Sequence, residues 1–223
     1  MYYPMKQPYG FALIINIKSF DGRTDKDVEL DERTGSDVDV KKLQDLWDQL
    51  GFEVRTHVDL KAHEIYGVVR KMANADALQN SSCFVCCIMT HGDMGVVYGS
   101  DSKSLDIKDI IDLFKQDNCS ALTEKPKLFF IQACRGCQGS PPGMPEIKPT
   151  PELDASALSE ADGDVDCDHI NDSTFSRSAD PSEAHFLIGY STVPDHASFR
   201  NVKIGTWYID ALVEIFSHYH KDE

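Results

Sequence analysis

Short apolar runs alternate with amphipathic segments along most of this chain. Continuous apolar runs bounded by turn residues are typical of buried strands, and apolar positions three or four residues apart are typical of helices. On this basis we expect strands over residues 11–17, 52–58, 83–90, 128–134 and 186–191, and helices over 38–50, 62–77, 107–114 and 206–220. This alternation predicts an α/β fold, with a mostly parallel central sheet between two layers of helices.

The most informative short sequence is Gln-Ala-Cys-Arg-Gly at residues 132–136. It ends an apolar run and precedes a loop rich in Gly and Pro. Open α/β folds bind ligands at the carboxyl ends of their strands, so Cys134 is a candidate nucleophile. Two other interpretations are open: Cys134 as an ordinary core residue, and Cys134 with Cys137 as a redox pair or half of a zinc site.

The two interpretations of the C-x-x-C pair have little support from the surrounding sequence. A redox pair gains from a helix that begins at the first cysteine, but Gly and Pro follow Cys137. A zinc site needs a second pair, and Cys83 and Cys86 lie three residues apart in a predicted strand, so they point to opposite faces. We therefore expect no metal, no organic cofactor and reduced thiols.

A histidine follows the preceding predicted strand, in Thr-His-Gly-Asp at residues 90–93. If these two strands are parallel neighbours, His91 and Cys134 lie at the same sheet edge, where an imidazole can act as acid or base. Gly92 leaves the backbone open to approach, so the amides of Gly92 and Cys134 would bind an oxyanion. The alternative for His91 is an ordinary polar turn residue, since the chain has eight histidines.

Charge is distributed unevenly along the 223 residues, and the net charge is -15. Without a basic patch we expect no nucleic-acid partner, and without a run of about 20 apolar residues we expect no membrane span. The segment 146–183 holds eleven acidic residues against two basic ones, which predicts a solvated linker. Cys167 and Ser173 occupy positions where a calcium-binding loop needs Gly and Glu, so we expect no calcium.

Taken together, these motifs resemble the caspase family. His-Gly precedes the Gln-Ala-Cys-Arg-Gly motif by 43 residues, and similar segments occur at residues 33–39, 189–194 and 198–201. The resemblance extends over nearly the whole chain and implies a caspase-like three-layer fold. It also implies a cytoplasmic cysteine endopeptidase of apoptosis or related signalling, which cleaves protein substrates after Asp with Cys134 as nucleophile and His91 as acid and base.

The resemblance implies roles for further residues. The residues that would bind substrate are Arg33, Gln132, Arg200, Ser198, Phe199 and Trp207. The first three would surround the carboxylate of the residue before the cut bond (P1), because a guanidinium fork matches two carboxylate oxygens. Phe199, which stands where the family commonly has Trp, and Trp207 would line apolar subsites, with core packing as their alternative. A backbone carbonyl near Asp31 would orient His91.

The resemblance also divides the chain. Residues 1–145 correspond to a large subunit, 146–183 to an intersubunit linker and 184–223 to an incomplete small subunit. The linker would be cut after Asp by an upstream caspase, at Asp154 or alternatively at Asp164, Asp166, Asp168 or Asp172.

The ends of the chain lead to expectations about its role. The first predicted strand begins about ten residues from the start, so we expect an executioner-like caspase without a recruitment prodomain, or a fragment that lacks its N-terminus. The chain stops before the family's last strand, so we expect a C-terminally truncated domain that forms a homodimer only in a longer version. The alternative is a non-catalytic decoy that binds caspases or their substrates.

Overall fold

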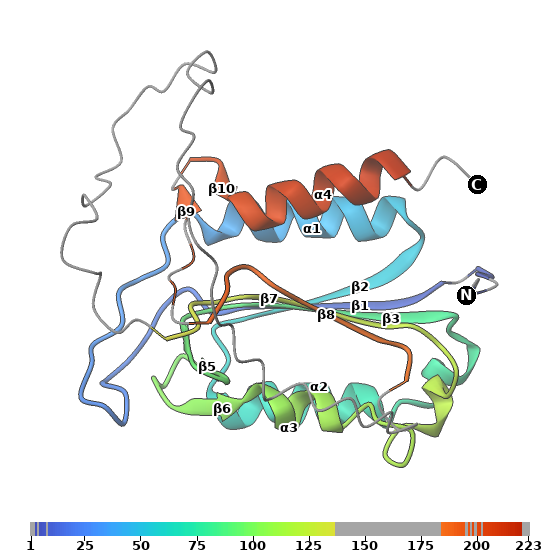
Figure 1. The fold of residues 1–223 in the computed structure, drawn as a ribbon, viewed down its shortest axis with the longest axis horizontal. Helices are drawn as coiled ribbons and strands as arrows, with labels where there is room; N and C mark the ends of the chain where they lie inside the picture. The colour runs from blue at the N-terminus through green and yellow to red at the C-terminus, as the bar shows by residue number, and fades with distance from the viewer. Residues whose placement is uncertain are drawn as a thin grey trace, which may run out of the picture.

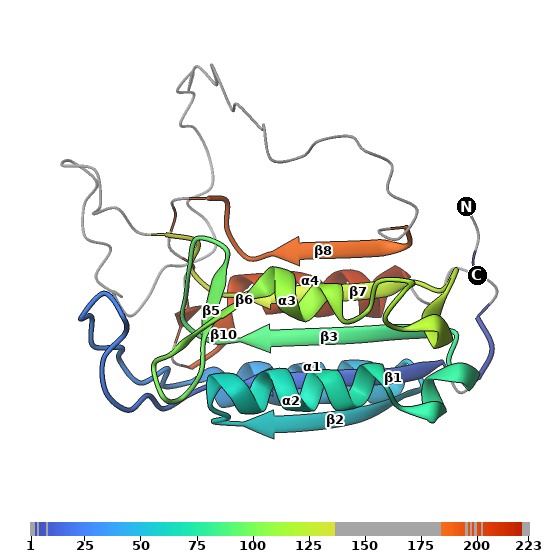
Figure 2. The same cartoon turned by 90° about the horizontal axis from the view of Figure 1, so that it is seen from below.

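The computed structural model describes residues 3, 5–7, 9–136, 184–194, 196, 198, 200–201 and 203–219. Its centre is a five-stranded sheet, in which all neighbours run parallel in the order β2-β1-β3-β7-β8 (Figures 1 and 2). These strands are β1 (Gly10–Asn16), β2 (Phe52–Val58), β3 (Cys83–Met89), β7 (Lys127–Gln132) and β8 (Phe186–Tyr190). The predicted α/β class and parallel sheet are confirmed.

Helices cover both faces of the sheet. Helices α1 (Ser36–Gln49) and α4 (Trp207–Tyr219) lie on one face, and α2 (Ala62–Ala73) and α3 (Ile107–Asp112) lie on the other (Figure 1). Two short 3-10 helices belong to the connections between these elements: η1 (Asp76–Asn80) lies between α2 and β3, and η2 (Ser120–Leu122) lies between α3 and β7.

One predicted helix is shorter than expected. The sequence pattern predicts a helix over residues 62–77, but α2 ends at Ala73. The side-chain amide of Asn74 donates a hydrogen bond of 2.8 Å to the carbonyl of Arg70. This bond satisfies one of the carbonyl groups that a helix leaves open at its end, so the chain turns here.

The sequence did not predict two small antiparallel sheets. One contains β4 (Gly92–Asp93), β5 (Val96–Tyr98) and β6 (Ser104–Asp106), and the other is the hairpin of β9 (Arg200–Asn201) and β10 (Gly205–Thr206). Strands of two or three residues are too short to show a periodic pattern. Both small sheets lie toward the carboxyl ends of the five long strands (Figure 2).

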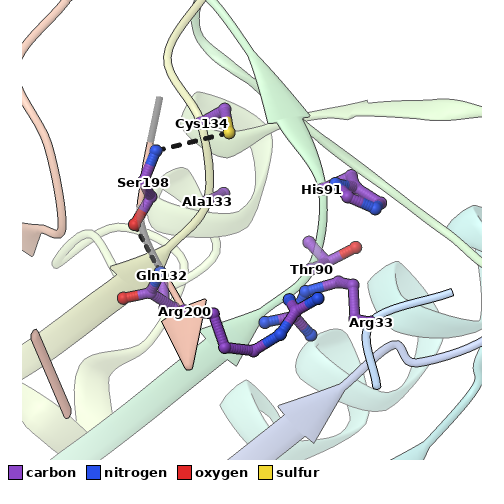
Figure 3. A pocket seen from close by; sticks show the side chains of 8 residues that line it. All are labelled: Arg33, Thr90, His91, Gln132, Ala133, Cys134, Ser198 and Arg200. Carbon is purple, nitrogen blue, oxygen red and sulfur yellow. Dashed lines mark hydrogen bonds between the residues drawn. The ribbon is translucent and has the colours of Figure 1, made fainter. Parts of the chain in front are cut away.

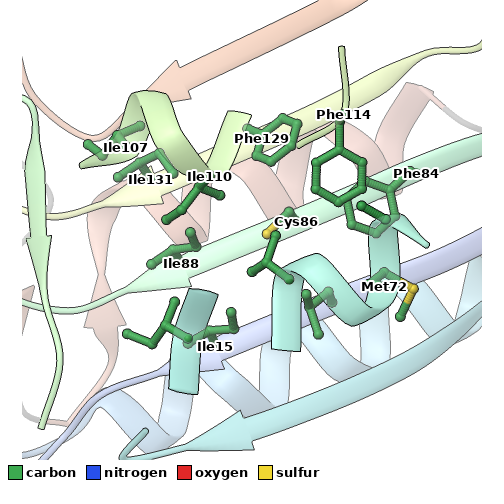
Figure 4. Close-up of a cluster of buried hydrophobic side chains, with 14 of the residues drawn as sticks. Ile15, Met72, Phe84, Cys86, Ile88, Ile107, Ile110, Phe114, Phe129 and Ile131 are labelled. Carbon is green, nitrogen blue, oxygen red and sulfur yellow. The ribbon is translucent and has the colours of Figure 1, made fainter. Parts of the chain in front are cut away.

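Aromatic rings fill the core under α2 and α3. Phe84 stacks on Phe114 with ring centroids 4.5 Å apart, and Phe129 meets Phe114 edge-on at 5.4 Å (Figure 4). The core on the other face centres on Trp47, whose ring lies 5.2 Å from Phe216. Each face of the sheet therefore has its own apolar layer.

Strand β3 contributes to both layers by alternation. Cys83 packs in the layer under α1 and α4, and Cys86 packs in the opposite layer. The prediction that these two thiols face apart is confirmed. Among the described residues, no three His, Cys, Asp or Glu side chains are grouped as metal ligands would be. None of the described helices combines the length and apolar character of a membrane span.

Strand β8 is an edge strand in the described part of the chain, where it pairs with β7 alone. Its Leu187 and Ile188 side chains are 49% and 37% exposed. An edge of this kind presents unpaired backbone groups and apolar side chains to a partner.

Replacing Trp47 with Ala should destabilise the fold strongly, because Trp47 is 1% exposed and joins α1 to β2, β7 and α4 through ring contacts. We expect a loss of about 3–5 kcal/mol in the free energy of unfolding, measured by urea titration. Val58→Ala, at an exposed position of β2, is the control and should change it by about 0.5 kcal/mol or less. A loss below 1 kcal/mol for Trp47→Ala would contradict this role.

Candidate active site

The parallel pairing of β3 with β7 brings Cys134 and His91 to one edge of the sheet. Met89 pairs with Gln132 at the end of the ladder, and the amide of Thr90 continues it with a bond of 3.1 Å to the Gln132 carbonyl. The chain segments that leave these strands line a cavity of about 210 Å³. Its lining residues are Arg33, Thr90, His91, Gln132, Ala133, Cys134, Ser198 and Arg200 (Figure 3).

Cys134 differs from the other described cysteines. It is partly exposed at the cavity, whereas Cys83, Cys86, Cys87 and Cys119 are buried. Burial raises the pKa of Cys83 and of Cys87 to about 12, which keeps both as inert thiols. Cys134 is therefore placed as a reactive thiol would be, while Cys137, its partner in the redox interpretation, lies outside the described residues.

His91 is held by its surroundings in one orientation. Its Nε2 lies 2.8 Å from the carbonyl oxygen of Asp31, and its ring packs on Phe20 with centroids 4.8 Å apart. Because a carbonyl only accepts, Nε2 carries the proton of the neutral ring, which leaves Nδ1 as the basic nitrogen. The expected hydrogen bond between His91 and a backbone carbonyl near Asp31 is present.

The pKa of His91 is lowered from its ordinary value, mainly because burial disfavours the charged ring. The hydrogen bond to Asp31 opposes this effect, and the nearby charges of Arg33 and Arg200 add to it. The neutral imidazole is therefore favoured in the free protein, as a general base requires.

Gly92 is required by close packing of the two strand ends. A Cβ atom at this position would lie 2.7 Å from the carbonyl oxygen of Cys134 and 2.9 Å from that of Val96. Among the described residues, the amide of Cys134 has no hydrogen-bond acceptor. The two segments thus lie in contact, and the oxyanion role of the Gly92 and Cys134 amides stays a prediction.

Two arginines from distant parts of the chain lie together in this cavity (Figure 3). Arg33 is 2% exposed and donates from Nη1 to Asn16 Oδ1 at 3.0 Å and to the Ile17 carbonyl at 2.8 Å. Arg200 donates from Nε to the Thr34 carbonyl at 3.1 Å. Burial and the charge of Arg200 lower the pKa of Arg33 to about 10.

The cavity is therefore suited to an anion. Its described lining holds two cationic side chains and no Asp or Glu. Gln132 donates from Nε2 to Ser198 Oγ, while its buried Oε1 has no partner among the described residues. Ser198 also directs its amide toward the Cys134 sulfur at 3.5 Å.

Some predicted site residues are not brought into this cavity. Trp207 begins α4 with 67% of its side chain exposed and is absent from the described lining, so its subsite role stays a prediction. Phe199 lies outside the described residues. The same holds for the linker 146–183 and its candidate processing sites, Asp154, Asp164, Asp166, Asp168 and Asp172.

Two residues of the site were not identified from the sequence. Thr90 lines the cavity and donates a hydrogen bond to the Tyr98 carbonyl at 2.6 Å. Asn16 holds Arg33 and is fully buried. Its only sequence signal is that it interrupts an apolar run, which marks a polar group that needs a buried partner.

Comparison with known proteins agrees with this geometry. The family model described as the caspase domain matches residues 9–223. Caspase-8 of Mus musculus is 36% identical over 222 residues, which cover 95% of this chain and 42% of that protein. Caspase-3 of Mesocricetus auratus is 37% identical over 225 residues, which cover 99% of this chain and 70% of that protein.

Caspase-10 of Homo sapiens is 37% identical over 203 residues, which cover 91% of this chain and 34% of that protein. The chain thus spans less than half of caspase-8 and caspase-10 and about two thirds of caspase-3. With a matching family model over almost its whole length, this chain belongs to the caspase family of cysteine peptidases.

Proposed function

We propose that this protein is a cysteine endopeptidase that cleaves protein substrates after Asp, in apoptosis or related proteolytic signalling. One observation carries the proposal: Arg33 and Arg200 lie in the same cavity as Cys134 and His91 (Figure 3). A thiol beside an imidazole is suited to acyl transfer. Two guanidinium groups in that cavity select an acidic side chain next to the bond attacked.

The charge of the cavity favours aspartate over neutral or basic P1 residues. A P1 carboxylate would accept charge-assisted hydrogen bonds from Arg33 and Arg200. A neutral side chain would leave the excess positive charge of the two arginines without a partner, and a basic one would add repulsion.

The reaction would proceed through a thioester. Nδ1 of His91 takes the proton of Cys134 as the sulfur attacks the P1 carbonyl carbon, and the amides of Gly92 and Cys134 hold the oxyanion. The imidazolium then protonates the leaving amine, and the C–N bond breaks. Water, deprotonated by His91, attacks the thioester and releases the acid and the thiol. Each step uses only groups of this chain and water.

We further propose that residues 1–145 and 184–223 are the large and small parts of one caspase domain. Arg33, His91 and Cys134 precede the linker 146–183, while Ser198 and Arg200 follow it, and all five line one cavity. Cleavage of a cytoplasmic zymogen by an upstream caspase, at Asp154 or at one of the four alternative aspartates, would divide the chain without dividing the site.

The recombinant protein should hydrolyse a fluorogenic peptide with P1 Asp and fail on the same peptide with P1 Asn or Lys. Cys134→Ala removes the nucleophile and should lower kcat/KM by at least about 10⁴-fold. Cys119→Ala, which removes a buried thiol remote from the cavity, is the control. Equal hydrolysis of the Asp and Asn peptides would refute the specificity, and peptide binding without turnover would favour the decoy function.

Changing Arg200 should separate charge from geometry in the P1 pocket. Arg200→Gln removes one cation and should lower kcat/KM for P1 Asp about 100-fold or more, because a buried charge-assisted bond is lost. Arg200→Lys keeps the charge without the planar fork and should recover only part of this loss. Arg55→Gln, on the exposed side of β2, should leave the rate unchanged within about twofold. Full activity of Arg200→Gln would exclude it from the pocket.

The pH profile should report the lowered pKa of His91. As pH falls, His91 takes up a proton and can no longer accept one from Cys134, so the acidic limb of kcat/KM should lie below pH 6.5. Arg200→Gln removes a charge that lowers this pKa, so its acidic limb should move to higher pH. An acidic limb that stays in place in this variant would contradict the electrostatic coupling.

A further inference from the structure

A buried carboxylate contacts the hairpin that carries one arginine of the cavity. Asp39 belongs to α1 and is 0% exposed. Its Oδ1 accepts a hydrogen bond of 2.8 Å from the amide of Thr206, while its Oδ2 has no partner among the described residues. Removing a carboxylate from water costs free energy unless charges or hydrogen-bond donors compensate it, so the burial of Asp39 requires an explanation. Asp39 lies in the first turn of α1, where the helix dipole favours a carboxylate, but this interaction does not require the side chain to be buried.

Asp39 is in contact with the hairpin that carries Arg200. Thr206 of β10 pairs directly with Arg200 of β9. The hydrogen bond to Asp39 therefore holds the residue that lies opposite Arg200 in the hairpin. Gly205 has a φ of +90°, and a Cβ there would lie 2.2 Å from Asp39 Oδ1. The close approach of hairpin and carboxylate thus depends on a glycine.

A second residue of α1 holds the same hairpin. Lys42, one turn after Asp39, donates from Nζ to the carbonyl of Ile204 at 2.6 Å and pairs with Asp210 of α4. Lys42 contacts the loop end of the hairpin, whereas Asp39 contacts the strand that pairs with Arg200. Of these two residues, Asp39 is the one that contacts the residue paired with Arg200.

Asp39 is also a countercharge shared by both arginines. Its charge favours the protonated forms of Arg33 and Arg200, whereas the charge of Arg200 disfavours the protonated form of Arg33. Burial raises the pKa of Asp39, and the hydrogen bonds from Thr206 and the charges of Arg33 and Lys42 oppose this shift. When ionised, this one carboxylate leaves one positive charge of the two arginines without compensation. A single P1 carboxylate would complete the balance.

We propose that Asp39 positions Arg200 opposite Arg33 through Thr206 and sets the net charge of the P1 pocket to that of one carboxylate. This inference rests on the proposed cleavage after Asp. Asp39 does not reach the substrate; it is a positioning residue that acts through the β9–β10 hairpin and through its field.

Two substitutions separate these actions. Asp39→Ala removes both the acceptor for Thr206 and the charge, whereas Asp39→Asn keeps an acceptor oxygen and removes only the charge. Asp45→Asn, which alters an exposed carboxylate of α1 paired with Lys41, is the matched control. Each is made in the Cys134→Ala protein, where labelled P1-Asp and P1-Asn peptides bind without being cut and fluorescence anisotropy gives Kd.

Asp39→Ala removes the buried oxygen that accepts a hydrogen bond from the Thr206 amide. It should weaken binding of the P1-Asp peptide about tenfold and speed hydrogen exchange at residues 200–206 by a similar factor. Asp39→Asn should keep exchange within about twofold and bind the P1-Asp peptide about threefold more tightly at low salt, since the pocket gains net positive charge. Its affinity should also fall more steeply with ionic strength. Asp45→Asn should match the parent.

The inference is wrong if Asp39→Ala leaves both exchange and Kd within twofold of the parent, or if Asp39→Asn weakens P1-Asp binding as much as Asp39→Ala. If Asp39→Ala does not fold, the affinity and salt dependence of Asp39→Asn still decide the charge role. Failure of the proposed function has a different signature: the parent binds P1-Asp and P1-Asn peptides equally. In that case hydrogen exchange at residues 200–206 alone decides whether Asp39 positions the hairpin.

Discussion

The site depends on the parallel register between β3 and β7. In this register Met89 lies opposite Gln132, so the segments that follow both strands leave the sheet at the same height. A slip by one residue would turn every side chain of a strand to the other face, and both faces are packed with apolar side chains. The two apolar layers therefore fix the register, and the register places His91 beside Cys134.

This arrangement places two like charges together, the buried Arg33 and the half-buried Arg200. Arg33 and Arg200 lie together, and the chain compensates them with the acceptors Asn16, Ile17 and Thr34 and with the charge of Asp39. These interactions leave the described lining of the cavity with two cationic side chains and no Asp or Glu. Burial and, after it, the charges of the two arginines lower the pKa of His91, so the arginines and the imidazole are electrostatically coupled in one cavity.

Residues before and after the linker both contribute side chains to the site. Ser198 accepts a hydrogen bond from Gln132 and directs its amide toward Cys134, and Arg200 binds the Thr34 carbonyl, so contacts of the cavity cross between the two parts of the chain. The core adds a further connection, because α4 packs on α1 through Phe216 and Trp47. Contacts of this kind hold residues from both parts of the chain in one cavity.

The sequence by itself determined the long strands and helices, because hydrophobic periodicity is a local property, and it identified Cys134, His91 and both arginines through motifs. It missed the short strands β4 and β9, the role of Asn16 and that of Asp39. These depend on contacts such as the one between Asp39 and Thr206, which lie 167 residues apart. Only the tertiary structure decided them, because packing of distant elements, rather than local pattern, determines which buried polar groups meet.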